Sequence, residues 1–227
     1  MRGAASGLVI FDCDGVLIDS EPLAIRVEVA LLAEAGIAIT GDEIMECYCG
    51  LSMPAMLADL EARFDRPLGD EFVSRHAERL RALCEAELQA MPRIEMALDA
   101  IPGKICVASS SAPERLRYTL GLAGLYDRFE PHIFSATMVS RGKPAPDLFL
   151  FAAERMGVRP EHCVVIEDSI PGVAAARAAG MTAVGFAGGG HCRDGHGARL
   201  RAAGAAVVVD TAAELLPILV ALPRRLR

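Results

Sequence analysis

The sequence predicts an α/β fold in which a doubly wound (Rossmann-like) parallel sheet is covered by helices on both faces. Six short apolar runs alternate with segments of helical periodicity along most of the chain. The runs are apolar almost throughout rather than at every second residue, which is typical of strands buried on both faces. A third observation adds a second domain, because residues 21–91 carry helical patterns only.

The six apolar runs are expected to be strands, and helix-start and helix-end signals lie between them. We expect strands at residues 7–12, 104–109, 132–136, 162–168, 182–187 and 205–210. Ser111 to Glu114 has the pattern of a capping box, so Ser111 is expected to cap the next helix. Pro146 suits the first turn of a helix that runs to Gly157. The helix after the fourth strand is expected to end at Gly180.

Residues 21–91 interrupt this alternation with several helices. The first helical pattern ends at Gly36, Thr40 to Glu43 forms a second capping box, and two further helical stretches follow. We therefore predict an α/β core of residues 1–20 and 92–227 and a small helical cap of residues 21–91 inserted after the first strand. Such a cap is expected to close over the site, exclude water and contact the leaving group.

The composition excludes several functional classes. A net charge of −7 over 227 residues argues against nucleic-acid binding, which usually needs a basic face. No apolar run approaches the roughly 20 residues that span a bilayer, and the first aspartate comes too early for a signal peptide. The seven cysteines include no CxxC pair, and Cys47 and Cys49 have a poor spacing for zinc. We expect a cytoplasmic protein with reduced thiols, no membrane partner and no need for more than a monomer.

Polar side chains follow the predicted strands at their carboxyl ends, where ligands bind in open α/β sheets. They are Asp12 and Asp14 after the first strand, Ser109 at the end of the second, and Glu167 with Asp168 at the end of the fourth. Residues two apart in an extended chain point to one side, so Asp12 and Asp14 are expected to address one centre. Clustered carboxylates repel unless a cation lies among them, and an all-oxygen cluster is typical of magnesium. The sequence therefore predicts a Mg²⁺ site.

The same edge of the sheet carries groups suited to a phosphoryl group. Lys143 adds a fixed positive charge, and Ser109 and Ser110 lie before a helix whose first N–H groups favour anions. An aspartate can attack phosphorus to form an acyl phosphate that water hydrolyses, while a second aspartate moves the protons. The alternative for Glu167 and Asp168 is that they cap the following helix.

Four motifs in this order, FDCDGVLIDSE, VASSS, GKPAPD and VVIEDS, with a helical insert after the first, resemble the haloacid dehalogenase superfamily. More narrowly, they are similar to its phosphatase and phosphomutase branch with a helical cap, and the resemblance covers the whole chain. It implies that Asp12 is the nucleophile and Asp14 the general acid and base. It also implies that Ser109 and Lys143 hold the phosphoryl group.

The resemblance further implies how magnesium is held. Asp12, Asp168 and the backbone carbonyl of Asp14 are the implied ligands, and Glu167 supports them from behind. Dehalogenases of the superfamily lack an acid at the position of Asp14, so its presence favours phosphoryl transfer.

Two positions separate a phosphatase from a β-phosphoglucomutase-like mutase. The mutases carry a histidine where this chain has Ala24, and an arginine where it has Met53. The prediction is a Mg²⁺-dependent phosphomonoester hydrolase that acts on a small phosphorylated metabolite, a sugar or sugar-acid phosphate, through an aspartyl-phosphate. The alternatives are a phosphomutase, a dehalogenase and a non-catalytic binding module.

The Gly-rich segment after the fifth predicted strand has two further readings. His191, Cys192, Asp194 and His196 suggest a metal site, but their spacings match no zinc pattern, so we expect a surface loop instead. The stretch GFAGGG suggests dinucleotide binding, but the full fingerprint and the helix start are absent, so this reading is set aside.

Overall fold

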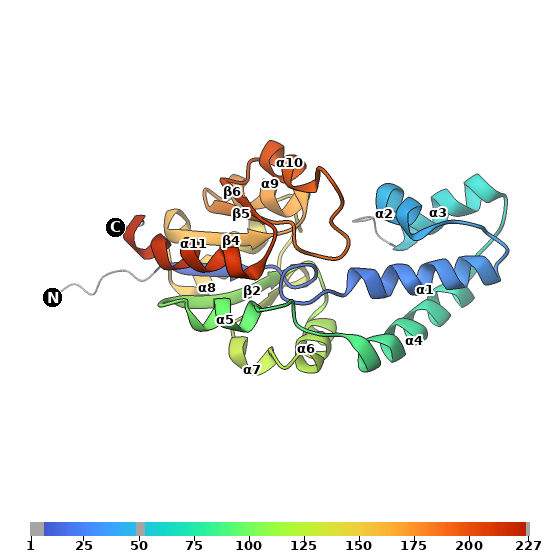
Figure 1. The fold of residues 1–227 in the computed structure, drawn as a ribbon, viewed down its shortest axis with the longest axis horizontal. Coiled ribbons are helices and arrows are strands. Elements are labelled where there is room, and N and C mark those ends of the chain that lie inside the picture. Colours follow the sequence, from blue (N-terminus) through green and yellow to red (C-terminus); the bar gives the residue numbers. More distant parts are fainter. Residues whose placement is uncertain (1–6, 49–52, 226–227) are drawn as a thin grey trace. The chain divides into compact units, whose positions relative to one another are not determined.

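The computed structural model describes residues 7–48 and 53–225, which form two compact units (Figure 1). The smaller unit is Ser20–Leu88, and the larger unit combines the chain before it with the chain from Gln89 onward. The sequence places the boundaries after residue 20 and after residue 91, which is one residue and three residues from this division.

The larger unit is built on a six-stranded sheet in which every neighbouring pair is parallel. The strand order is β3-β2-β1-β4-β5-β6. The strands are β1 (Leu8–Phe11), β2 (Lys104–Ser109), β3 (Ile133–Ser135), β4 (Cys163–Glu167), β5 (Thr182–Phe186) and β6 (Val207–Val209). All six predicted strands and the doubly wound α/β fold are confirmed.

Both faces of the sheet are buried, which explains the continuous apolar runs. Leu8 and Ile10 of β1 belong to a core cluster with residues such as Phe149, on the helix that follows β3. Phe11, whose side chain points the other way, packs edge to face on Phe129 with the ring centroids 6.1 Å apart. Because side chains on both faces of β1 are buried, a polar residue on either face would lose contact with water, and β1 contains none.

Helices connect the strands of the larger unit, as Figure 1 shows. They are α5 (Ile94–Asp99), α6 (Pro113–Leu122), α7 (Tyr126–Phe129), α8 (Asp147–Met156), α9 (Ile170–Ala178), α10 (His196–Ala203) and α11 (Ala212–Arg225), with 3₁₀ turns at Ala136–Met138 and Pro160–His162. α8 ends at Gly157 with φ of 66°, and the chain after α9 turns at Gly180 with φ of 74°. Both predicted helix ends are therefore confirmed.

The predicted cap of α6 is wrong. The residue before its first turn is Ala112, without a side-chain cap, and Pro113 opens the helix. The Ser111 hydroxyl donates instead to the Asp14 carboxylate at 2.8 Å. A charged acceptor from another part of the fold competes for this hydroxyl, and a proline at the helix start has no N–H to satisfy.

The smaller unit consists of four described helices: α1 (Glu21–Glu34), α2 (Gly41–Tyr48), α3 (Met53–Phe64) and α4 (Gly69–Glu87). The predicted capping box before α2 is confirmed, because Glu43 N donates to Thr40 Oγ1 at 3.2 Å and Thr40 N donates to Glu43 Oε2 at 3.0 Å. His76 of α4 meets Glu28 of α1 with Nε2 to Oε1 at 3.6 Å.

Two further findings concern the described part of the chain. None of its helices is long and apolar enough to cross a membrane. Its cysteines are all unpaired, and Cys49 lies outside the described residues. The expected reduced thiols agree with this.

Candidate active site

Three buried carboxylates gather where β1 and β4 end side by side. Asp12 follows β1, Glu167 is the last residue of β4, and Asp168 comes next. One oxygen from each lies within 4.8 Å of the others. The position follows from the sheet, because Asp12 N continues the ladder by donating to Ile166 O at 3.0 Å. The strand order reverses between these two strands, which is where ligands bind in doubly wound folds.

Lys143 lies among these carboxylates. Its Nζ is 3.0 Å from Asp12 Oδ1 and 3.1 Å from Glu167 Oε1, and only 4 % of its side chain is exposed. Burial by itself lowers the pKa of a lysine, but the two carboxylates outweigh it and raise the pKa of Lys143. The predicted proximity of a fixed positive charge to Asp12 is therefore a feature of the structure.

Negative charge is nevertheless in excess at this point. Burial raises the pKa of Asp12 to about 8, and the Glu167 carboxylate adds to the rise, while Lys143 opposes it. Burial also raises the pKa of Asp168. A donor set of three clustered carboxylate oxygens fits a hard divalent cation such as Mg²⁺, whose charge would offset this repulsion.

Glu167 is fixed from behind rather than free to cap α9. Ser169 Oγ donates to Glu167 Oε1 at 2.8 Å, and Asp168 N donates to Glu167 Oε2 at 3.1 Å. The cap of α9 is Ser169, whose hydroxyl accepts from Gly172 N at 3.0 Å. A Cβ on Gly172 would fall 1.4 Å from Glu167 Oε1, so this position excludes every larger residue.

The Asp14 side chain has partners of its own, apart from the three clustered carboxylates. Its carboxylate accepts from Ser111 Oγ at 2.8 Å and from Arg115 Nη2 at 3.2 Å. The close carboxylate group described above does not include it. The predicted role of its backbone carbonyl toward a metal stays a prediction. Ser111 and Arg115 are contacts that the sequence reasoning missed, and the single signal was their place just after β2, on the turn and in the first part of α6.

The two serines predicted to bind phosphate sit in different surroundings. Ser109 is buried at the end of β2, and its hydroxyl accepts from Ser111 N at 3.1 Å. Ser110 is exposed. Ser135, at the end of the neighbouring strand β3, donates to Ser111 O at 2.7 Å and so fixes this turn. A serine hydroxyl and the backbone N–H groups of a fixed turn are donors of the type that binds an anion.

A histidine from the loop after β5 completes the surroundings of Asp168. His191 is buried, with Nε2 3.0 Å from Asp168 Oδ2, and His196 Nε2 lies 2.7 Å from the Asp168 carbonyl oxygen. Burial opposes the charged form of His191, but the bond to Asp168 raises its pKa to about 11. Asp19 Oδ1 accepts from Gly190 N at 2.9 Å and holds the same loop. Sequence reasoning missed these contacts.

Gly15 makes this close packing possible. Its φ is +76°, and a Cβ there would lie 2.0 Å from Asp168 Oδ2 and 2.9 Å from His191 Cε1. Only glycine satisfies both the backbone conformation and the space. The glycine after Asp14 is thus required by the carboxylate and the histidine that lie against it.

The comparisons with known proteins identify the family. A family model, the haloacid dehalogenase-like hydrolases, matches residues 7–180. The chain belongs to this family. Among curated relatives of this hydrolase, 6-phosphogluconate phosphatase of Escherichia coli (strain K12) is 29% identical over 190 residues, 83% of each chain. Hexitol phosphatase B of the same organism is 32% identical over 180 residues, covering 77% of this chain and 81% of the relative.

Solved structures of the same family match nearly the whole hydrolase. One is a HAD family hydrolase from Deinococcus radiodurans R1 with bound phosphate and sodium, with 36% identity, a TM-score of 0.84 and coverage of 96% and 97% of the two chains. Another, a putative β-phosphoglucomutase from Thermotoga maritima, has 29% identity, a TM-score of 0.79 and coverage of 94% and 98%. The chain is therefore a hydrolase-family enzyme with this fold.

Proposed function

We propose that the chain is a Mg²⁺-dependent phosphomonoester hydrolase that acts on a small phosphorylated metabolite, a sugar or sugar-acid phosphate. The observation that carries the proposal is the contact of Lys143 with Asp12 and Glu167 inside a cluster of buried carboxylates. One cation is fixed there by the fold, and the donor set suits a second. A tetrahedral or trigonal phosphoryl group carries the negative charge that such a site is built to receive.

The relatives support the substrate class. Two curated relatives are named as phosphatases of 6-phosphogluconate and of hexitols, and the Deinococcus structure has bound phosphate. A sugar phosphate and a sugar-acid phosphate share the phosphomonoester and a polyhydroxyl leaving group. We therefore propose this shared chemistry, and we propose further that the helical unit Ser20–Leu88 acts as the specificity cap. A cytoplasmic monomer is part of the same proposal.

In the proposed mechanism Asp12 is the nucleophile. One carboxylate oxygen of Asp12 attacks phosphorus, the bond from phosphorus to the ester oxygen breaks, and an aspartyl-phosphate forms. Asp12, Asp168 and the Asp14 carbonyl would hold magnesium, which would supply positive charge to offset the negative charge of the phosphoryl group. Lys143 stays paired with the transferring group, because its ammonium is held beside Asp12. Ser109 and Ser110 would donate to the other phosphoryl oxygens.

Asp14 handles the protons in both halves of the reaction. It gives a proton to the leaving alkoxide, then takes one from the water that attacks the phosphoenzyme, which releases phosphate and regenerates Asp12. Ser111 and Arg115 hold its carboxylate from one side, so its orientation is set before the substrate arrives. The Glu167 carboxylate holds the Lys143 ammonium, and the Ser169 hydroxyl in turn holds the Glu167 carboxylate.

Three alternatives differ in what they release. A phosphomutase would isomerise a sugar phosphate in a bisphosphate-dependent assay, but Ala24 and Met53 stand where the mutase reading needs histidine and arginine. A dehalogenase would release halide without phosphate, and Asp14 disfavours it. A non-catalytic binding module would give neither product, yet would keep its ligand when Asp12 is replaced.

The test is a phosphate-release screen across phosphorylated metabolites, with p-nitrophenyl phosphate as a generic substrate. We expect release from sugar or sugar-acid phosphates that EDTA stops and Mg²⁺ restores. Asp12→Asn and Asp14→Asn are expected to abolish release while leaving the fold intact by circular dichroism. Asp127→Asn, an exposed acid in the same unit, is the matched control and should behave as wild type. Wild-type turnover by Asp12→Asn would contradict the mechanism.

A further inference from the structure

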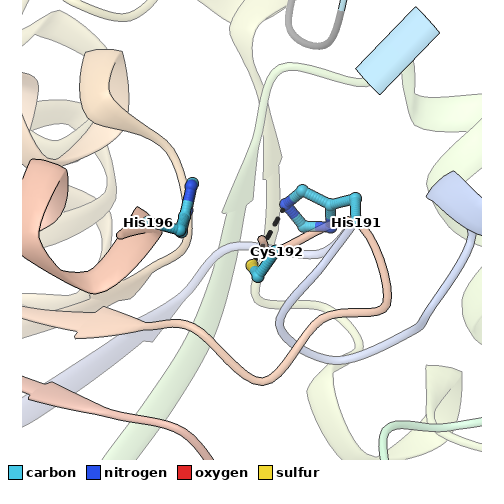
Figure 2. A group of neighbouring side chains, drawn as sticks. All are labelled: His191, Cys192 and His196. Carbon is cyan, nitrogen blue, oxygen red and sulfur yellow. Dashed lines mark hydrogen bonds between the residues drawn. The ribbon is translucent and has the colours of Figure 1, made fainter. Parts of the chain in front are cut away.

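The loop after β5 brings together three side chains whose chemistry differs from that of the carboxylate cluster. They are His191, Cys192 and His196, shown in Figure 2. One ligand atom from each lies within 4.8 Å of the others. His191 and Cys192 come from the loop itself and His196 is the first residue of α10, so the spacing along the chain is compact but irregular. The spacing of these residues along the sequence matches no zinc motif, but the fold of the loop brings their side chains close together.

The distances suit a tetrahedral ion with nitrogen and sulfur ligands. His191 Nε2 lies 3.5 Å from Cys192 Sγ. In a tetrahedral zinc site, with Zn–N of about 2.0–2.1 Å and Zn–S of about 2.3 Å, such a pair of ligand atoms is roughly 3.6 Å apart. The other pairs, at up to 4.8 Å, need a shift of the His196 side chain, which is only half-buried.

The two ring nitrogens of His191 differ: Nε2 contacts Cys192 Sγ and Asp168 Oδ2, whereas Nδ1 has bonding capacity to spare. His191 Nδ1 is buried and has no hydrogen-bond partner in the described structure. A buried ring nitrogen without a partner is costly, and it is a lone pair or a donor that a ligand can satisfy. The contact between Cys192 and His191 is at 3.5 Å, a weak bond between a thiol and a ring nitrogen.

Hydrogen bonds hold the loop at both ends, so its backbone keeps its place when an ion binds, and His196 exchanges its bond to Asp168 for the ion. Asp19 Oδ1 accepts from Gly190 N at 2.9 Å on one side, and His196 Nε2 bonds the Asp168 carbonyl oxygen at 2.7 Å on the other. Cys192 N donates to Gly189 O at 2.9 Å and closes a turn. A loop held by such contacts loses little conformational freedom when an ion binds.

We propose that His191, Cys192 and His196 form a second metal site, which takes a borderline or soft transition cation such as Zn²⁺. Its nitrogen and sulfur donors separate it from the oxygen-only cluster of Asp12, Glu167 and Asp168, which suits Mg²⁺. Asp168 Oδ2 lies 3.0 Å from His191 Nε2 and so connects the two sites. These three residues define the site, so substitutions at them test the proposal.

The direct test is zinc titration by calorimetry on the full chain in excess Mg²⁺, which occupies the oxygen cluster. We expect one Zn²⁺ per chain. Cys192→Ser and His196→Ala should each weaken the affinity at least about tenfold. The controls are Cys47→Ser and His132→Ala, which remove an exposed cysteine and an exposed histidine outside the loop and should bind as wild type. Absence of binding, or wild-type affinity in Cys192→Ser, overturns the proposal.

Two further measurements locate the ion, the first on the wild-type chain and the second on a variant outside the proposed site. Co²⁺ added to the wild-type chain in excess Mg²⁺ should give a near-ultraviolet band from thiolate to cobalt, and a spectrum without it overturns the assignment of Cys192 as a ligand. Asp12→Asn should retain zinc binding. If that substitution abolishes it, the ion lies in the carboxylate cluster and the proposal is wrong.

The shared contact with Asp168 gives the site a consequence for activity, which rests on the proposed function. An ion on His191 withdraws that side chain from Asp168, so the Mg²⁺ concentration for half-maximal phosphate release should rise about threefold or more with one equivalent of Zn²⁺. Cys192→Ser should abolish this rise. A wild-type enzyme that binds zinc without any rise overturns the coupling. An enzyme that binds zinc but releases no phosphate contradicts the proposed function instead.

Discussion

The core and the helical unit both contain one charged group between two opposite charges, but in different surroundings. In the core, Lys143 lies between Asp12 and Glu167, and its side chain is 4 % exposed. In the helical unit, Glu34 accepts from Arg75 and Arg79, and its side chain is 43 % exposed. The same Coulomb attraction acts in both, but water screens the second and is absent from the first.

The difference teaches what each arrangement is for. Exposed ion pairs contribute little to stability, so the Glu34 group adds mainly to a solvated helix surface. A buried charged cluster carries a desolvation cost that its attractions repay only in part, and breaking it leaves a charge unpaired. A fold that keeps such a cluster at the reversal of its strand order holds it for chemistry rather than for stability.

The largest expected effect is therefore on Lys143. Lys143→Met should abolish phosphate release and lower the free energy of unfolding by about 3–5 kcal/mol, because Asp12 and Glu167 lose their buried partner. Urea unfolding and a phosphate-release assay measure the two effects. The chain's other lysine, Lys104, is exposed, so Lys104→Met is the matched control. Equal stability of the two variants would contradict the contrast between buried and exposed charge.

The next effect is a pH dependence of stability in the metal-free protein. Burial and Glu167 raise the folded pKa of Asp12 to about 8 from an ordinary 3.8, so between these values the folded state holds a proton that the unfolded state has lost. Stability then falls as pH rises, by up to about 1.4 kcal/mol per pH unit for this group. His191, raised to about 11, adds a loss above its ordinary 6.5. Measurements between pH 4 and 6.5 therefore isolate the carboxylates.

Denaturant unfolding across that window, in EDTA, checks this prediction. Asp12→Asn should make the decline shallower, and Asp127→Asn should leave it unchanged. Mg²⁺ should flatten the wild-type curve, because a bound cation favours the ionised carboxylates. A metal-free wild type whose stability rises over the window would show that Asp12 is not protonated in the folded state.

A smaller effect is expected at Asp14, whose partners are half-exposed. Arg115→Met should lower kcat for phosphate release roughly fivefold with little change in KM, because a charged hydrogen bond discounted for solvent contributes about 1 kcal/mol. A shift in the pH profile of kcat would mark the role as proton positioning. Arg117→Met, on the exposed side of the same helix, is the control and should match wild type. A loss in KM alone would place Arg115 in substrate binding instead.

The sequence predicts the parts of the site that depend on strand ends. β1 and the first four residues of β4 are apolar because both faces are covered, so Asp12, which follows β1, and Glu167, which ends β4, stand out. Because adjacent parallel strands end at one edge, their proximity follows from topology alone. The fold class rests on this pattern and the haloacid dehalogenase resemblance on the four motifs, and both are confirmed.

The remaining contacts depend on loop conformation, which no periodicity encodes. Ser111 has a capping-box partner in sequence, yet its hydroxyl donates to Asp14, since a charged carboxylate is a strong acceptor. His191 and His196 reach Asp168 only because the Gly-rich loop folds back over Gly15. Local sequence patterns do not reveal hydrogen-bond partners that come from distant parts of the chain. This explains the wrong cap of α6 and the missed histidine contacts.

The smallest expected effect is at Glu34, and it tests the exposed side of the comparison. Glu34→Gln removes the charge that Arg75 and Arg79 share, but both arginines stay solvated, so Tm should not change measurably. High salt should likewise leave the wild-type Tm unaltered by this group, because exposed pairs are already screened. Differential scanning calorimetry of the wild type and of Glu34→Gln at low and high salt measures this. A large loss in Glu34→Gln would mean that the exposed triad contributes like a buried one. The contrast with Lys143 would then lie in geometry rather than in burial.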